Sequence, residues 1–460
     1  MYDIKHPRRK ANAAASSALV VYNLLSLFPI DNLILHQHAL YRVRLLPRIT
    51  HSSYSVKRSN IISPNASLHR YVVSLALVLA CSAALTILLR PNHSKPYNSS
   101  YGSFGTQDFI QFWSAYQIIE GGGNPYDADQ LQLIQLDLGR EMPQPRRMWH
   151  PPWVIVLLAP VLSLDFDLAS TTLLFINLCL LMLSGLLLAK IYRPHTKGLL
   201  SIALPLSFAP AWQTLQLGQV SLILCLCVIL FIYAMQMKHF TLAGFISATF
   251  SIKLHLFLLP LILILHHLIR KRSSKLLLGV IGGGTTLLIA CYFLSTDVFT
   301  QWRTALQEPP LHWVVTSLVG IVRLALLKIG DGFQAWPVVV IPGLAAVMYL
   351  FILMQRKAEV DWLRELPLIL CISLIVSPYA WFFDSCVILP VYLVLCFSAL
   401  EDNVALRRLA KLAAIFGLQL IAFGLPYLGT LQQHHFFWYP IATAALYVWL
   451  SEPISVKRRA

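Results

Sequence analysis

The sequence predicts an all-α, polytopic membrane protein, a bundle of about 12 transmembrane helices at ~20 residues per span. Three observations support this fold class: the composition, the recurrence of apolar runs, and the placement of the positive charges. Of the 460 residues, 57% are hydrophobic and only 12% are charged. A soluble domain carries about 25% charged residues, so a water-soluble fold is excluded.

The positive charges are distributed as expected for a membrane protein. With the N-terminus inside, the inner segments hold 27 of the 36 Lys and Arg residues and the outer segments hold the other nine. This bias follows the positive-inside rule, so the net charge of +16 reflects topology and predicts no nucleic-acid partner. Both termini are predicted to be cytoplasmic, and the uncommon polar residues collect on the outer side.

The predicted elements follow one another along the chain. Residues 1–70 are predicted to be a basic cytoplasmic segment, either disordered or lying on the membrane, or else residues upstream of a misassigned start codon. The transmembrane domain covers 71–451, with 90–152 as a large outer loop, and 452–460 form a basic cytoplasmic tail. Two shorter runs, 153–164 and 313–328, are predicted to be re-entrant or interfacial helices. The predicted spans are 71–89, 169–190, 199–212, 219–236, 240–252, 254–269, 275–295, 336–354, 366–380, 384–400, 408–427 and 437–451.

The first outer loop contains a helix with an acid at its start. Its aromatic and apolar residues recur at helical spacing, which predicts an amphipathic helix on the membrane surface. Asp108 falls in the first turn, where the helix dipole favours a carboxylate, so it either stabilises the helix start or takes part in chemistry. Gly121 to Gly123 end the helix, and Asn124-Pro125-Tyr126-Asp127 turn the chain. The residues at helical spacing are Phe109, Phe112, Trp113, Tyr116 and Ile119.

Further polar residues interrupt the outer ends of the spans. His150 lies among tryptophans and is either a surface residue or a ligand. Gln213, Gln216 and Gln219 fall in a gap between two spans, where amides either bind sugar hydroxyls or tie helices together.

A second group of polar residues follows later in the chain. Lys253 and His255 divide two apolar runs, and a Lys at membrane depth is costly unless it is paired or faces a water-filled cavity. Lys253 is therefore predicted to neutralise a phosphate, with snorkelling to the headgroups as the alternative. Tyr379 and Asp384 lie in an aromatic break; Asp384 serves catalysis, holds Lys253 or caps the following helix.

Taken in order, these segments resemble glycosyltransferase family 87, integral membrane enzymes of the GT-C type that include polyprenol-phosphate-mannose-dependent α-mannosyltransferases. Trp149 stands where the family commonly has a tyrosine. The resemblance covers about residues 70–400. The matching pieces are Asp108-Phe109, Phe112-Trp113, Gly121 to Gly123, Asn124 to Asp127, His150-Pro151-Pro152, Gly218-Gln219, Ala243-Gly244 through Lys253, and Ser377-Pro378.

The resemblance implies a GT-C bundle in a bacterial plasma membrane, with its active site facing outside. It implies transfer of a hexose, mannose above all, from a polyprenyl-phosphate sugar to a lipid or glycan acceptor, with inversion. Asp108 would be the general base. No metal and no cofactor is predicted. The residues predicted to bind donor or acceptor are Phe112, Trp113, Tyr126, His150, Gln216, Gln219, Lys253, His255, Tyr379 and Asp384.

The competing function class is a multi-span transporter or lipid flippase. Many transporters are built from internal repeats and carry polar sites at the bilayer midplane. This sequence has no internal repeat of hydropathy and few charges within its spans, which favours the glycosyltransferase.

Overall fold

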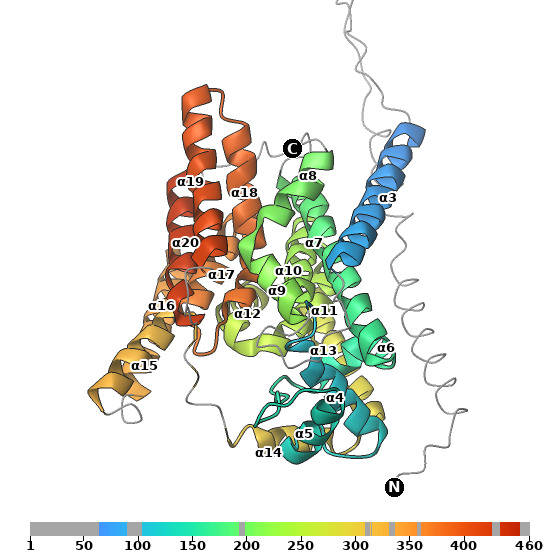
Figure 1. The fold of residues 1–460 in the computed structure, drawn as a ribbon. Coiled ribbons are helices and arrows are strands. Elements are labelled where there is room, and N and C mark those ends of the chain that lie inside the picture. The colour runs from blue at the N-terminus through green and yellow to red at the C-terminus, as the bar shows by residue number, and fades with distance from the viewer. Residues whose placement is uncertain are drawn as a thin grey trace, which may run out of the picture.

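The structure is a computed structural model that describes residues 64–89, 104–192, 198–308, 313, 315–330, 336–356, 360–425 and 433–450. All regular elements within these ranges are helices (Figure 1), which confirms the all-α class. The predicted tail and residues 1–63 of the predicted N-terminal segment lie outside the described residues. The first described helix begins at Pro64, seven residues before the predicted start of the membrane domain.

The helices run in chain order from Pro64 to Leu450. They are α3 (Pro64–Leu89), α4 (Phe109–Glu120), α5 (Ala128–Asp137), α6 (Trp153–Leu162), α7 (Phe166–Tyr192), α8 (Gly198–Ala203), η1 (Leu204–Ser207), α9 (Ala209–Leu217), α10 (Ser221–Gln236), α11 (Phe240–Ser247), η2 (Ala248–Lys253), α12 (Leu254–Lys271), α13 (Ser274–Leu294), α14 (Val298–Ala305), α15 (Leu318–Ile329), α16 (Trp336–Arg356), α17 (Trp362–Val376), η3 (Phe382–Ile388), α18 (Leu389–Leu400), α19 (Ala405–Gly424), η5 (Gln433–Phe436) and α20 (Trp438–Leu450).

The chain is a multi-span helical membrane protein, although the predicted number of spans is not confirmed. In the described part of the chain, five helical stretches are both long and apolar enough to cross a membrane. They are Val72–Leu89, Phe166–Tyr192, Phe240–Lys271, Ser274–Leu294 and Phe382–Leu400. The other predicted spans correspond to shorter or interrupted helices. For example, the run 199–212 is divided into α8, η1 and α9, because Pro205 and Pro210 each occupy the start of a new short helix, where the missing N–H costs nothing.

The bundle has a buried centre and a lipid-facing rim. The stretch Phe382–Leu400 is 89% buried within the protein, whereas Val72–Leu89 is only 17% buried. The first therefore forms the middle of the bundle and the second presents its side chains outward. Elsewhere α11 and α13 touch backbone to backbone, since a Cβ at Gly244, Gly279 or Gly283 would overlap the facing main chain; such small residues allow close helix packing in membranes.

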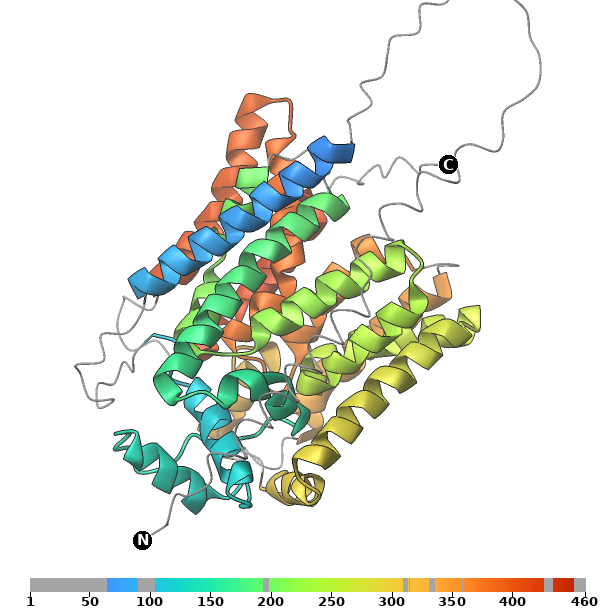
Figure 2. The ribbon, with the colours of Figure 1, turned by 90° about the vertical axis from the view of Figure 1, so that its right-hand side faces the viewer.

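One end of the bundle is covered by a layer made of α4, α5 and α14 (Figures 1 and 2). The predicted helix is present as α4 and ends at Gly121, but the prediction that it lies on the membrane surface as an amphipathic helix is wrong. Most of its circumference is buried, because α5, α6 and α7 cover it on several sides. Its buried residues are Phe109, Ile110, Gln111, Phe112, Ser114, Ala115, Tyr116, Ile118 and Ile119.

The two shorter apolar runs, 153–164 and 313–328, form short helices, as predicted. α6 has 10 residues and α15 has 12, and at 1.5 Å per residue both are about half as long as the ~30 Å hydrocarbon core. α6 packs against α4 and α7 through Val154, Ile155 and Leu158, which are buried. At these lengths neither helix spans a membrane; α6 packs against α4 of the layer, whereas α15 packs against α16 and α17.

Candidate functional site

A main-chain clamp fixes the segment that carries Asp108. The Gly105 N–H donates to the Gln216 carbonyl at 2.7 Å, and the Asp108 N–H donates to the Leu217 carbonyl at 2.8 Å. Gly218 follows with a left-handed φ of 72°, and a Cβ there would overlap the Gly105 carbonyl oxygen. Only glycine therefore allows the turn after α9 and the start of α4 to meet this closely.

The carboxylate of Asp108 does not cap α4. Asp108 is the residue before the helix, and its side chain makes no capping hydrogen bond. Instead its Oδ2 accepts a hydrogen bond from Gln219 Nε2 at 2.9 Å, and its Oδ1 lies 3.7 Å from Arg146 Nε. The Asp108 side chain is 13% exposed, so the carboxylate is held in place yet remains accessible. Asp108 thus makes no side-chain capping bond, while its position at the helix start agrees with stabilisation by the helix dipole.

Two residues that sequence reasoning missed support this acid. Asn177 on α7 donates from Nδ2 to the Gln219 carbonyl at 3.2 Å, which fixes the residue that holds Asp108. Gln135 on α5 is fully buried and bonds the Arg146 main chain twice, at 2.8 Å to its N–H and at 3.0 Å to its carbonyl. In the sequence, this contact was indicated only by the pair Arg146-Arg147 shortly before Trp149-His150.

Lys253 and Asp384 form a buried ion pair. Lys253 Nζ lies 2.5 Å from Asp384 Oδ1, and their side chains are 4% and 1% exposed. Ser221 completes a triangle, donating to Asp384 Oδ1 at 3.1 Å and accepting from Lys253 at 3.2 Å. Asp384 Oδ2 also accepts the Trp381 N–H at 3.0 Å and caps η3. Both structural alternatives for Asp384 thus hold, and the Lys253 charge is already neutralised.

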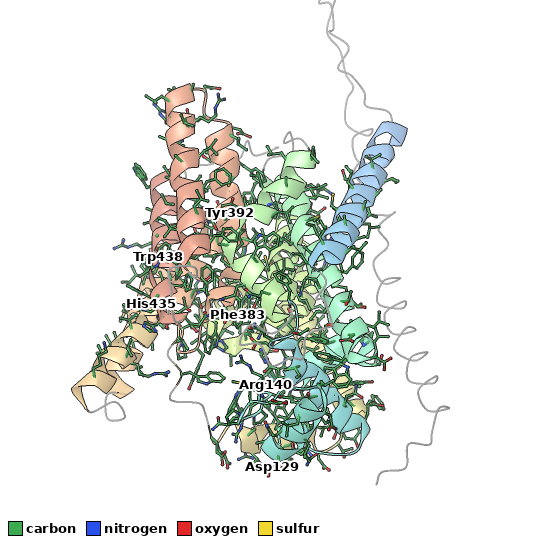
Figure 3. The ribbon with its side chains drawn as sticks, viewed as in Figure 1. Asp129, Arg140, Phe383, Tyr392, His435 and Trp438 are labelled. Atoms are coloured by element: carbon green, nitrogen blue, oxygen red, sulfur yellow. The ribbon has the colours of Figure 1, made fainter. Side chains whose placement is uncertain are left out.

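An aromatic row leads from the outer layer to this ion pair. The ring centroids of Trp149 and Trp313 lie 6.0 Å apart, those of Trp313 and Trp381 5.3 Å, and those of Trp381 and Phe383 6.3 Å. Lys253 Nζ sits 4.7 Å from the Phe383 centroid. Figure 3 shows Phe383 where the bundle meets the layer that contains Arg140. Such a row offers flat apolar faces on which a sugar ring or an isoprenoid can lie.

His150 is neutral in this environment. Burial, and then the nearby charges of Lys253 and His255, hold the pKa of His150 well below its ordinary value. Its ring lies 5.0 Å from that of Phe112, and its buried Nδ1 has no hydrogen-bond partner in the described structure. A neutral imidazole with a free nitrogen can exchange hydrogen bonds with a hydroxyl but cannot supply positive charge.

His255 extends the site in another direction, toward Tyr379. Their ring centroids are 6.3 Å apart in an edge-to-face arrangement. The guanidinium carbon of Arg323, a residue of α15, lies 5.9 Å from the ring centroid of Tyr379. Arg323 lies in the short apolar run 313–328, and its proximity to the other polar residues could not be predicted without the fold.

Three of the predicted binding residues make structural contacts. Phe112 is fully buried, and its ring lies 5.0 Å from that of His150. Trp113 donates from Nε1 to the Leu164 carbonyl at 2.9 Å, which ties α4 to the turn before α7. Gln216 is exposed and contributes its carbonyl to the clamp. The role of these three residues in binding donor or acceptor stays a prediction.

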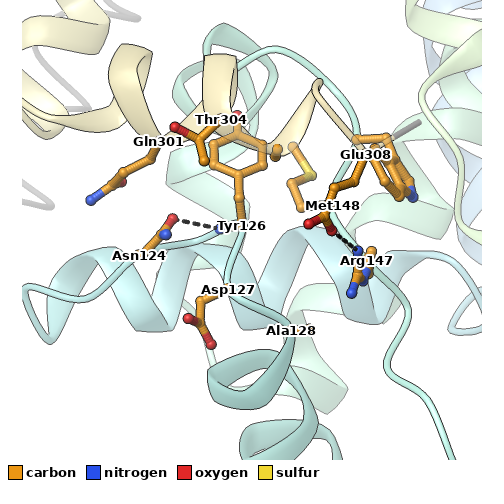
Figure 4. Close-up of a pocket in the computed structure, with 11 residues that line it drawn as sticks. Asn124, Tyr126, Asp127, Ala128, Arg147, Met148, Gln301, Thr304 and Glu308 are labelled. Carbon is orange, nitrogen blue, oxygen red and sulfur yellow. Dashed lines mark hydrogen bonds and ion pairs between the residues drawn. The ribbon is translucent and has the colours of Figure 1, made fainter. Parts of the chain in front are cut away.

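Tyr126 belongs to a separate cavity of about 200 Å³ (Figure 4). Its hydroxyl donates to the His150 carbonyl at 3.0 Å, and its N–H donates to Asn124 Oδ1 at 3.0 Å. Arg147 and Glu308, 3.6 Å apart, lie at one side of the cavity. Neither Asp108 nor Lys253 lines it. The cavity lining is Asn124, Tyr126, Asp127, Ala128, Arg147, Met148, Trp149, Gln301, Thr304, Ala305 and Glu308.

One acid pair in the outer loop has metal-binding spacing, which the sequence prediction of no metal overlooked. Asp127-Ala128-Asp129 reads as an acid, one residue and a second acid. In the structure Asp127 Oδ1 accepts the Gln130 N–H at 2.9 Å and caps α5, while Asp129 is exposed in the first turn. Asp127 thus caps the helix, and Asp129 lies where the helix dipole favours a carboxylate.

The comparisons with known proteins point to one family. Residues 149–378 match the family model described as glycosyltransferase family 87. This segment includes His150, Gln219, Lys253, His255 and Arg323 and begins after Asp108. No curated protein and no solved structure matches the chain.

Proposed function

Because the chain belongs to glycosyltransferase family 87, we propose that it transfers a hexose, mannose by preference, from a polyprenyl-phosphate sugar. The acceptor is a lipid or glycan, and transfer takes place on the outer face of a bacterial plasma membrane. Its family membership makes it a glycosyltransferase, and its apolar helices make it a multi-span membrane protein. The donor, the sugar, the acceptor and the sidedness belong to the proposal.

The proposed reaction is a single inverting displacement at the anomeric carbon. An acceptor hydroxyl oxygen attacks that carbon while Asp108 takes the hydroxyl proton. The bond between the anomeric carbon and the phosphate oxygen breaks, and its electron pair leaves with the polyprenyl phosphate. The chemistry needs one carboxylate within hydrogen-bond reach of the acceptor and positive charge near the leaving phosphate. It is proposed to need no metal.

The observation that carries the proposal is the state of the Asp108 carboxylate. A helix-capping role would have tied it to N–H groups of α4, yet its hydrogen bond goes to Gln219, a residue 111 positions away. The neighbouring main chain is clamped at two points. An acid that is accessible and held from outside its own helix has the features expected of a positioned base.

The surroundings of the base suit a lipid-linked donor. The row from Trp149 to Phe383 offers stacking faces for the sugar or the first isoprenes. The cavity beside Tyr126 offers a place for part of the acceptor, and its volume of about 200 Å³ suits a single sugar ring. The transporter alternative gains no comparable support, because the family match concerns sugar transfer.

The test is transfer of radiolabelled mannose from polyprenyl-phosphate mannose to membrane lipid extract by purified protein in nanodiscs. Asp108→Asn keeps the shape and the acceptor oxygen for Gln219, so it should remain folded, while loss of a general base lowers the rate about 10²–10⁴-fold. The matched control is Asp129→Asn, which removes an exposed carboxylate from the same loop and should keep wild-type turnover. Equal activity of the two variants would show that Asp108 is not the base, and inhibition by EDTA would contradict metal independence.

A further inference from the structure

Arg323 is a cation with unsatisfied donors. Its Nε and Nη2 are buried and have no hydrogen-bond partner among the described residues. Its guanidinium carbon lies 5.9 Å from the ring centroid of Tyr379. A half-buried guanidinium without a counter-charge among the described residues is costly, so a ligand that supplies negative charge and acceptors would lower that cost.

Three other cations of this end are paired with acids. Lys253 is bound to Asp384 at 2.5 Å. Arg146 faces Asp108 at 3.7 Å, and Arg147 faces Glu308 at 3.6 Å. A phosphate approaching the Lys253 pair would meet a neutral unit, whereas Arg323 offers a full positive charge. Arg323 is therefore a candidate for the donor phosphate that the sequence prediction, which named Lys253, did not include.

The position of Arg323 is fixed by the fold. Ser317 caps α15 by accepting the Gly320 N–H at 3.0 Å, and the Thr316 N–H donates to the Ala380 carbonyl at 2.7 Å. Ala380 adjoins Tyr379, so the start of α15 is attached to the aromatic break. The guanidinium is thereby held against a ring whose other neighbour is His255.

We propose that Arg323 binds the phosphate of the polyprenyl-phosphate donor, with its planar N–H pair directed at the phosphate oxygens. The inference rests on the proposed function and names the residue that recognises the charged part of the donor. Tyr379 is the platform that holds the guanidinium, and Lys253 with Asp384 is the structural ion pair beside it. Arg323 is a binding residue, and Asp108 remains the base.

The test compares polyprenyl phosphate with uncharged polyprenol of the same length, both added to protein in nanodiscs and followed by tryptophan fluorescence. This readout does not require turnover. In wild-type protein the phosphate should raise affinity about ten- to hundred-fold over the alcohol, as expected for charge-assisted hydrogen bonds. Arg323→Gln should remove that difference while the affinity for polyprenol stays unchanged, which also shows that the variant is folded. Arg323→Lys should restore part of it.

The matched control is Lys328→Gln, which removes an exposed cation from the same helix and should leave the preference intact. A preference for phosphate that survives in Arg323→Gln overturns the inference, as does equal competition by phosphatidylglycerol, which would make Arg323 a headgroup anchor. The transfer assay distinguishes failure of the proposed function from failure of this inference. If the proposed function is wrong, wild-type protein transfers no sugar from polyprenyl-phosphate mannose, whatever the Arg323 variants bind.

Discussion

Substituting Gly218 tests whether the main-chain clamp positions the base. In Gly218→Ala the new Cβ would overlap the Gly105 carbonyl oxygen and lie 2.7 Å from Phe109 Cβ, whereas real Cβ contacts essentially never fall under 3.0 Å. The left-handed φ of 72° adds about 1–2 kcal/mol of strain for any residue with a Cβ. The start of α4 must therefore move, and Asp108 moves with it.

The expected loss of activity follows from the size of that movement. The Phe109 contact alone requires a shift of about 0.3 Å to reach 3.0 Å, and the overlap with the Gly105 oxygen requires more, so the displacement is on the order of 1 Å. A misplacement of about 1 Å can lower the rate on the order of 10²-fold. Loss of the two clamp hydrogen bonds would add about 1 kcal/mol of instability each.

The matched control is Gly122→Ala. Gly122 also has a left-handed φ, of 77°, but a Cβ there has no neighbour within 4 Å, so this variant carries the backbone strain without the clash. The assay is mannose transfer in nanodiscs, with thermal denaturation of each variant measured in parallel. If Gly218→Ala retained at least half of the activity of Gly122→Ala, the clamp would not be what positions Asp108.

Three further predictions concern the ion pair, the histidine and the topology. Lys253→Met should destabilise the protein by about 3–5 kcal/mol, because it leaves a buried carboxylate unpaired. Adding Asp384→Leu should recover most of this loss, as measured by thermal denaturation. If Lys253→Met alone left the stability unchanged, the ion pair would not be structural. The pKa of His150 in the folded protein is lowered, mainly by burial. The stability that neutral His150 contributes is therefore complete above pH ~6.5 and is lost as the pH falls below that value. His150→Gln should make the melting temperature less dependent on pH on the acid side, and an unchanged pH dependence would refute this. Reporter fusions at Arg272 and Gly122 should report opposite sides of the membrane, as the 27 to nine division of the 36 Lys and Arg residues indicates. Reporters on the same side would contradict the predicted topology.

The hydropathy pattern was enough to predict the helical bundle but not the environment of its parts. Every predicted span corresponds to a helix or an interrupted helical stretch, because apolar residues without loop signals have few other options in a membrane. The burial of α4 could not be predicted in this way. An aromatic stripe is equally suited to a lipid surface and to neighbouring helices, and only the fold brings α5, α6 and α7 around it.

The candidate site shows the same division. The sequence singled out Asp108, Gln219, Lys253 and Asp384 as unusual residues and offered the pairing of Asp384 with Lys253 as one of three alternatives. Because the two residues are 131 positions apart, only the fold could decide among these alternatives. Arg323 was missed for the same reason, since a charge in a doubtful apolar run looks like the end of a span until the ring of Tyr379 is beside it.

The clamp on Asp108 also has a consequence for how the enzyme is made. The acid and the glutamine that holds it are separated by 111 residues, which corresponds to roughly 6–22 s of translation at about 5–20 residues per second. During that interval the nascent chain already exposes Asp108 but has no turn after α9 on which to fix it. Asp108, the proposed base, therefore acquires its position only after the segment with α9 and Gln219 has been synthesised, so the order of synthesis sets the earliest moment at which the proposed site is complete.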